Sequence, residues 1–310
     1  MRIQSMWSPE RGWLWWSHNR NDYTIPHLKN GKVWNHNLKR YEMLDLITMG
    51  RIDQAWKVLI HGPAGAGKTW IAKSFPDPIT GDLEGSTERY DMARIDLRNA
   101  VFEEYKKDKD GKDILGEPDK QAFSVMNFIR KLGREDHPYQ TLAIDTLDWL
   151  EPKVWENTCR RLGITGMEKM HYGKAYHEAL DEWDLFLSGL NYLHKKKDMN
   201  ILLLAHTSQK VTQDKDMNEV KRHDIKLQTK AAAKFIEWSE LIGFLTYDSY
   251  VTNKNGKESS QHHGDRILLV QEDGQYVAKN RFGYQGEPIK PVDYETLKEK
   301  LEPVEEVAHG

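Results

Sequence analysis

The chain has 310 residues, of which 38% are hydrophobic and 30% are charged, and its formal net charge is -3. That length allows one sizeable α/β core with appendages, or two small domains. The charge argues against a protein that coats nucleic acid by bulk electrostatics, so a nucleic-acid role would need a local basic surface. No apolar run is long enough to cross a membrane, no signal peptide is expected, and the single cysteine, Cys159, excludes an internal disulfide. We therefore expect a cytoplasmic protein.

Residues 1–50 differ from the rest of the chain. Their tryptophans lie among His, Asn, Arg and Lys, and no strong helical or strand period is visible before the short amphipathic run Tyr41–Met49. We interpret this part as an N-terminal arm. Its aromatic residues either pack on the core or on a neighbouring subunit, or form a base-stacking surface, and packing is the commoner use of such clusters.

The middle of the chain alternates strands and helices. Lys57–His61 is a short apolar run that ends at a glycine-rich turn, and a helix is predicted over Lys68–Phe75. Thr141–Asp145 and Asn200–His206 are also apolar on both faces, as buried parallel strands are. Apolar residues at helical spacing predict a helix over Lys174–His194 between them. This alternation predicts a mostly parallel α/β sheet.

The last third is more polar. Thr207–Gln228 reads as a long connection, which is a sign of a functional or disordered loop, and a helix is predicted over Thr229–Trp238. Asn253–Asp265 is expected to be an exposed hairpin tip. An Asp-Gly turn at 273–274 predicts a hairpin between the last two of three further strands. These three strands are expected at Leu241–Val251, Arg266–Glu272 and Gln275–Lys279.

Residues 62–69 fit the pattern G-x-x-x-x-G-K-[ST], directly after an apolar strand and directly before a helix. Glycines let backbone N–H groups point at phosphate oxygens, Lys68 adds a full charge near the β- and γ-phosphates, and the Thr69 hydroxyl can ligate Mg²⁺. The motif predicts a site for ATP with Mg²⁺, with Trp70 as a further nucleotide contact. The residues of this phosphate loop are Gly62, Pro63, Ala64, Gly65, Ala66, Gly67, Lys68 and Thr69.

Four polar residues are candidates for the same site. Asp145 ends its strand at the mouth of the sheet, where it would hold Mg²⁺ through water, although it could instead cap a helix. Glu84, after the predicted second core strand, is the candidate general base, with Asp82 as a rival on the same turn. Either could also be a solvated loop carboxylate. His206 ends its strand facing the γ-phosphate and could sense its loss, or could be a satisfied strand-end histidine.

Several segments in order resemble phage-encoded RecA-like P-loop ATPases of the AAA type. This group includes Sak-type single-strand annealing proteins, which are relatives of RecA and RadA recombinases. The resemblance covers about residues 56–285 and matches Glu84 to the catalytic glutamate of that group. The segments are DLEGSTERYDMARID at 82–96, TLAIDTLDWLE at 141–151, YGKAYHEAL at 172–180, LLLAHTS at 202–208 and KLQTKAAAKFIEWSE at 226–240.

A second motif, KNRFG at 279–283, is similar to the KNRFG of RadA and to the K-x-R-x-G of DnaB-type helicases. That resemblance implies that Lys279 and Arg281 reach the γ-phosphate of a neighbouring subunit in a ring or filament. On the residues alone, a basic turn after a strand is the other interpretation.

The recombinase resemblance also implies that Thr207–Gln228 and Cys159–Lys174 are DNA-contacting loops. Acidic residues interleave with the cations of the first segment, so a solvated mobile loop is an equal interpretation. The cations that would contact DNA phosphates are Lys210, Lys215, Lys221 and Arg222.

We expect a RecA-like core over 51–288, with an arm over 1–50 and an acidic tail over 289–310. The expected function is an ATP-dependent, single-stranded-DNA-binding recombination ATPase in the host cytoplasm. Its expected partners are ATP and ADP, DNA, further copies of itself and a single-strand-binding protein. A hexameric helicase and a nucleotide-gated ATPase that remodels a partner without touching DNA are the alternatives.

Overall fold

The computed structural model describes two separate units, Met1–Asp53 and Gln54–Gly310. The described residues are 5–8, 12–17, 22–24, 28–29, 32–35, 40–41, 54–213, 219–254 and 257–302, with side chains over 54–211, 221–248 and 264–302.

The first unit contains short antiparallel strands. β1 (Ser5–Ser8), β2 (Gly12–Ser17) and β3 (Asp22–Thr24) form one three-stranded sheet. The other strands are β4 (Leu28–Lys29), β5 (Lys32–Asn35) and β6 (Arg40–Tyr41). These strands lie in a part of the sequence that shows no strong strand period. Aromatic residues favour strands, but runs this short hold too few residues for an alternation to stand out. The amphipathic run beyond residue 41 lies outside the described residues.

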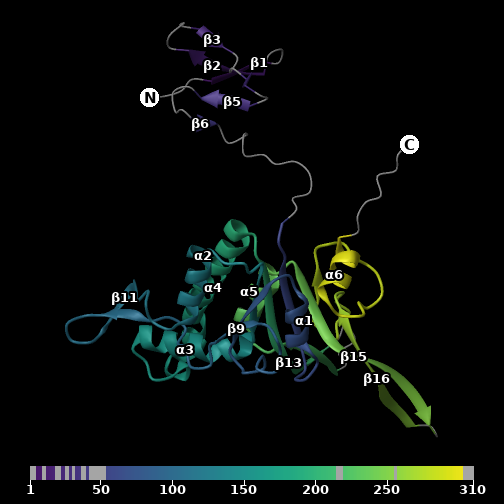
Figure 1. Cartoon of the computed structure of the whole chain (residues 1–310). Helices are drawn as coiled ribbons and strands as arrows, with labels where there is room; N and C mark the ends of the chain where they lie inside the picture. The colour runs from purple at the N-terminus through teal and green to yellow at the C-terminus, as the bar shows by residue number, and fades with distance from the viewer. Residues whose placement is uncertain are drawn as a thin grey trace. The chain divides into compact units, whose positions relative to one another are not determined.

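The second unit is built on a sheet that is mostly parallel, as predicted (Figure 1). Among the described residues its strand order is β16-β15-β7-β13-β12-β8-β9, and the last six strands run parallel. β13 therefore lies between the strand that leads into the phosphate loop and the strand that ends at Asp145. The bounds of these strands are β7 (Lys57–Gly62), β8 (Pro78–Asp82), β9 (Ala93–Asp96), β12 (Thr141–Asp145), β13 (Asn200–Gln213), β15 (Leu241–Lys254) and β16 (Lys257–Leu269).

Helices cover both faces of this sheet (Figure 1). Successive side chains of β13 pack on opposite faces of the sheet. Leu203 packs in the hydrophobic core that includes α2–α5, whereas Leu202 and Leu204 pack in the core that includes α1 and α6. All three side chains are 0% exposed, which explains why the strand is apolar throughout. The helices are α1 (Lys68–Ser74), α2 (Val125–Arg134), α3 (Leu147–Leu162), α4 (Lys174–Lys197), α5 (Thr229–Trp238) and α6 (Tyr294–Leu301).

The polar segment after His206 is not the long loop that we predicted. β13 continues beyond the core to Gln213 and pairs antiparallel with β14 (Glu219–Ile225); we call this pair the β13–β14 ribbon. A cross-strand ion pair supports it, because Asp224 on β14 lies 3.0 Å from Lys210 on β13. Asp224 also lies 3.1 Å from Arg222 on its own strand. A two-stranded ribbon of this kind needs no buried apolar face, so the sequence lacked the signal of a core strand.

The last strands also pair differently from the prediction. β15 and β16 form one long hairpin, so most of 253–265 is strand rather than tip. The Asp-Gly turn exists, with Gly274 at φ 91°, but it joins no hairpin. β17 (Lys279–Asn280) instead pairs with Leu241 and Ile242 at the start of β15. The hairpin prediction was wrong because a local turn signal does not specify which strand the chain returns to.

A candidate nucleotide site

The phosphate loop connects β7 to α1 at the carboxyl end of the sheet. Gly65 and Gly67 have φ angles of 77° and 100°, a region that side chains disfavour. Lys68 is 6% exposed, and its ammonium donates to the carbonyls of Gly62 and Pro63 at 3.2 and 3.1 Å. Burial lowers the pKa of Lys68, and no carboxylate among the described residues forms an ion pair with it. A buried cation held only by carbonyls fits an anionic ligand such as a phosphate chain.

Next to the loop, oxygen atoms converge on Asp145. The hydroxyls of Thr69 and Ser86 each donate to Asp145 Oδ2 at 2.7 Å. Burial raises the pKa of Asp145, and these two hydrogen bonds oppose that shift. Hydroxyl and carboxylate oxygens are ligands that fit Mg²⁺. The described residues contain no group of three or more His, Cys, Asp or Glu that could hold a metal, so a Mg²⁺ here would complete its shell with phosphate oxygens and water.

The two rival carboxylates after β8 have different surroundings. Asp82 is 3% exposed and accepts hydrogen bonds from the backbone N–H groups of Glu84, Gly85 and Thr87 at 3.1, 2.6 and 3.1 Å. Its oxygens therefore organise the turn. Glu84 is half-buried, and burial raises the pKa of its carboxyl. Its Oε1 lies 3.8 Å from Nε2 of His206. Of the two, Glu84 has the carboxylate that is free to act on a ligand.

His206 is fixed by a residue that our sequence reasoning did not single out. Asp148, in the first turn of α3, accepts from the backbone N–H of His206 at 2.9 Å and from the ring Nδ1 at 3.0 Å. Lys226 lies 3.4 Å from the same carboxylate. Burial alone would raise the pKa of Asp148, but the hydrogen bonds from His206 outweigh it and hold that pKa below its usual range. Because the carboxylate accepts at Nδ1, the ring turns Nε2 toward Glu84.

The side chains of Lys68, Glu84, Asp145 and His206 lie together at the carboxyl ends of β7, β8, β12 and β13. Residues 54–282 match the family model described as an AAA domain. The chain belongs to the AAA-domain family. The predicted class of a P-loop ATPase is thereby confirmed.

Two solved structures similar to this AAA domain are a RadB recombinase and the flagellar accessory protein FlaH from Methanocaldococcus jannaschii. The first is 11% identical with a TM-score of 0.33, and the match covers 71% of this chain and 90% of that one. The second is 9% identical with a TM-score of 0.29, covering 80% and 92%. No curated protein sequence matches the chain. Among the described residues, no helix is long and apolar enough to span a membrane.

The predicted trans-acting cations do not reach the phosphate loop of their own AAA domain. Lys279 Nζ donates to the carbonyls of Ile236 and Glu237 at 2.5 and 3.0 Å, and Arg281 donates to Glu237 at 3.2 Å. They therefore cap the carboxyl end of α5, where cations are favoured. Burial lowers the pKa of Lys279. β17 pairs at the start of β15, whereas the phosphate loop follows the end of the parallel strand β7.

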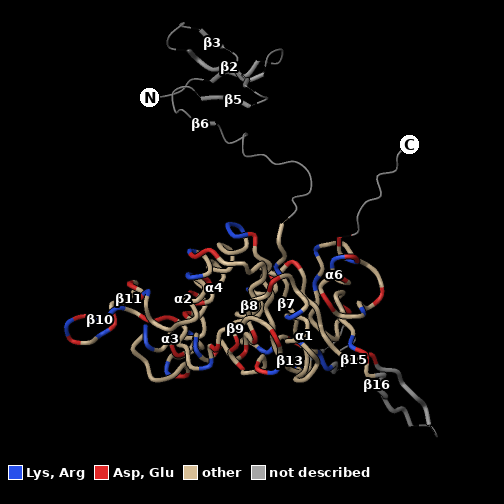
Figure 2. Tube along the Cα trace, viewed as in Figure 1, with Lys and Arg blue, Asp and Glu red and all other residues tan. Residues whose placement is uncertain are grey.

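The predicted DNA-contacting cations of the AAA domain lie on the β13–β14 ribbon. Lys210 pairs with Asp224, and Arg222 pairs with Asp224 and, at 2.6 Å, with Glu272. Lys221 is exposed, and Lys215 lies outside the described residues. Acidic and basic residues are interspersed over the described core (Figure 2). The ribbon surface therefore carries both positive and negative charges.

The second predicted DNA-contacting segment, Cys159–Lys174, begins in the last turn of α3 and ends at the first residue of α4. Between the two helices it forms two short 3-10 turns, η2 (Met167–Lys169) and η3 (His171–Gly173). Tyr172 there is fully exposed and has a positive φ of 56°. Trp70 of the predicted nucleotide contacts is 49% exposed on α1, beside the phosphate loop.

Proposed function

We propose that the chain is an ATP-dependent, single-stranded-DNA-binding ATPase of phage recombination, which hydrolyses Mg-ATP at interfaces between subunits. The observation that carries this proposal is the convergence of Lys68, Asp145 and Glu84 at one edge of the sheet, next to a histidine that leads into the β13–β14 ribbon. The family establishes the ATPase core, and the sequence motifs supply the recombinase part of the proposal.

Each residue of the site has a separate task in this proposal. Lys68 and the loop N–H groups bind the phosphates, while Thr69 and Asp145 would hold Mg²⁺. Bound there, Mg²⁺ would neutralise charge that builds up on the phosphate oxygens during phosphoryl transfer. Glu84 orients the attacking water and takes its proton, since a half-buried carboxylate with a raised pKa is a stronger base than an exposed one.

His206 connects this chemistry to the ribbon. Its backbone pairs with the end of β7, and the next residue, Thr207, starts the pairing with β14. The carbonyl of His206 also accepts from the N–H of Lys226, which follows β14 at the same end of the ribbon, at 2.9 Å. A movement of the ring when the γ-phosphate leaves would therefore act on both strands of the ribbon. We infer that DNA affinity follows the nucleotide state by this route.

In this proposal Lys279 and Arg281 act at an interface between subunits. Within one chain they cap α5, so a role in hydrolysis requires that they reach the site of a second copy. A cation supplied in this way stabilises the transition state, as an arginine finger does. We therefore place the homo-oligomer within the catalytic unit.

A second candidate is an ATPase that remodels a protein partner and does not bind DNA. The ion pairs of Lys210 and Arg222 favour it, because paired cations neutralise few DNA phosphates. A helicase shares the features of the first proposal and differs in unwinding a duplex.

ATP hydrolysis with and without single-stranded DNA separates the candidates. We expect DNA to raise kcat, and Lys221→Ala to weaken that stimulation and reduce its salt dependence. Lys106→Ala, which removes an exposed lysine from a different hairpin, is the matched control. Hydrolysis that DNA does not change in any of these proteins would reject the DNA role and favour the remodelling ATPase. Displacement of a duplex strand would identify a helicase.

A further inference from the structure

An arginine that neither the motifs nor the family assigns lies against the phosphate loop. Arg266 is on β16, and a Cβ added to Gly67 would lie 2.8 Å from Arg266 Nε and 2.9 Å from Cζ. The guanidinium therefore contacts the last glycine of the loop, next to Lys68. Among the described residues no ion pair or hydrogen bond engages this guanidinium, although Asp265 is its neighbour in sequence.

The hairpin that carries Arg266 is anchored to the same loop. Tyr247 of β15 lies directly opposite Arg266 in the ladder, and its hydroxyl donates to the carbonyl of Gly65 at 3.0 Å. Directly opposed residues project from the same face of two antiparallel strands. The pair thus covers the phosphate loop at two of its glycines, Gly65 and Gly67. The strand register therefore places Arg266 against the loop.

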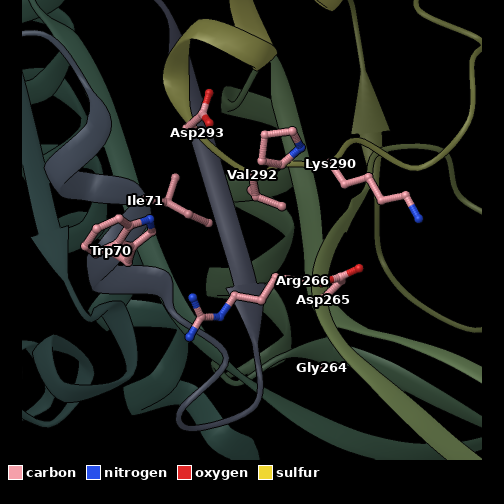
Figure 3. Close-up of a pocket in the computed structure, with 9 residues that line it drawn as sticks. Trp70, Ile71, Gly264, Asp265, Arg266, Lys290, Val292 and Asp293 are labelled. Atoms are coloured by element: carbon pink, nitrogen blue, oxygen red, sulfur yellow. The ribbon is translucent and has the colours of Figure 1, made fainter.

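Beside the guanidinium is a cavity of about 480 Å³, large enough for a small ligand. Figure 3 shows Arg266 directed toward the loop below Trp70, with Ile71 and Val292 facing each other and Lys290 pointing away. The wall thus has an aromatic ring on α1, aliphatic side chains, the unpaired guanidinium of Arg266 and the carboxylates Asp265 and Asp293, while Lys290 pairs with Asp248. A flat aromatic ring beside an aliphatic wall suits a nucleobase, whereas the cation next to the loop suits phosphate.

We propose that Arg266 binds the nucleotide phosphates from within the same subunit, and that the cavity beside it takes the nucleoside, with the base against Trp70. This inference rests on the proposed nucleotide site and deepens it. A guanidinium can bind two phosphate oxygens at once, which an ammonium cannot do with the same geometry. The nucleotide then meets one cation in the loop, Lys68, and a second from β16, before any neighbouring subunit contributes.

The test is equilibrium binding of Mg-ADP, Mg-ATP and tripolyphosphate to the full-length chain, measured by calorimetry. Arg266→Ala should weaken all three about 10- to 100-fold, as the loss of a charge-assisted contact does, and Arg266→Lys should weaken them less. Trp70→Ala should weaken ADP and ATP but leave tripolyphosphate unchanged, because only the nucleotides carry a base. Arg134→Ala removes an exposed arginine from the end of α2 and should bind all three like the wild type.

Arg266 is exposed, so its variants should keep the wild-type midpoint of thermal unfolding, which guards against a folding defect. Unchanged binding in Arg266→Ala and Arg266→Lys, together with loss of binding in Lys68→Ala, would overturn this inference alone. Wild-type protein that binds no nucleotide would overturn the proposed site as well. Equal weakening of tripolyphosphate and ADP by Trp70→Ala would reject the nucleoside part and keep the phosphate part.

Discussion

Asp148 holds His206 at two points, the backbone N–H at 2.9 Å and the ring Nδ1 at 3.0 Å. The first bond fixes where the core part of β13 ends, and the second fixes which ring nitrogen faces Glu84. One carboxylate therefore sets both the position and the tautomer of the residue that we place between the catalytic site and the ribbon. This role makes Asp148 a positioning residue, because it acts on the ligand only through His206.

Asp148→Asn tests that positioning role. Asparagine keeps an acceptor oxygen but loses the charge, so we expect kcat to fall roughly 10- to 100-fold while KM changes little. Because Asp148 acts through His206, adding His206→Ala to this variant should cause almost no further loss in steady-state hydrolysis. Independent, additive losses in the double variant would contradict the arrangement.

The raised pKa of Glu84 predicts the acid limb of the pH–rate profile. A general base must be deprotonated to work, so hydrolysis should decline as the pH falls through a pKa above the ordinary value of 4.5. The profile of kcat/KM for the wild type measures this limb directly. A limb at or below the ordinary carboxyl value would show that Glu84 is not the group that titrates in catalysis.

Glu151 gives a stability prediction with a definite sign. It is 7% exposed on α3 and accepts from the N–H of Gln228 at 2.9 Å, and burial raises its pKa from 4.5 to about 7. The folded state binds this proton more tightly than the unfolded state, so stability falls as the pH rises through that interval. Glu151→Gln should raise the free energy of unfolding by about 2 kcal/mol near pH ~8 and change it little near pH ~5. Denaturant titrations that show the same effect at both pH values would contradict the assignment.

Mixing two inactive variants tests the subunit-crossing cations. Lys68→Ala lacks phosphate binding and Arg281→Ala lacks the finger, so each alone should lose ATP hydrolysis by about 1,000-fold or more. If Arg281 acts on a neighbour, mixed oligomers contain some sites with an intact loop and an intact finger, and activity should partly return. Glu237→Ala, which keeps the carbonyl that Arg281 contacts, is the control for the α5 cap. Mixtures as inactive as their components would place Arg281 in a purely structural role.

The sequence was sufficient for features that are local or apolar. The phosphate loop follows from its motif, the bounds of α5 match the predicted Thr229–Trp238, and Thr141–Asp145 is a buried parallel strand because every residue in it is covered. Other features depend on which strand ends meet in space. Asp148 and Ser86 join the site only because the carboxyl ends of β12 and β8 are neighbours, and no spacing in the sequence predicts that contact.

The same limit explains the mistaken predictions. The β13–β14 ribbon is held by its backbone ladder and by the Lys210–Asp224 ion pair rather than by an apolar period, so its sequence resembles a polar loop. The KNRFG motif identifies Lys279, but the hydrogen bonds of Lys279 to α5 depend on the pairing of β17 with β15. The Asp-Gly turn predicts a different pairing for this strand.

The proposed mechanism requires both the phosphate loop and Glu84 for ATP hydrolysis by this AAA domain. The most direct measurement is Mg-dependent release of phosphate from ATP by the wild type, Lys68→Ala and Glu84→Gln, together with ATP binding by the same proteins. We predict that the wild type releases phosphate, that Lys68→Ala loses both binding and release, and that Glu84→Gln binds ATP but releases no phosphate. Release of phosphate by Glu84→Gln at the wild-type rate would contradict the assigned chemistry.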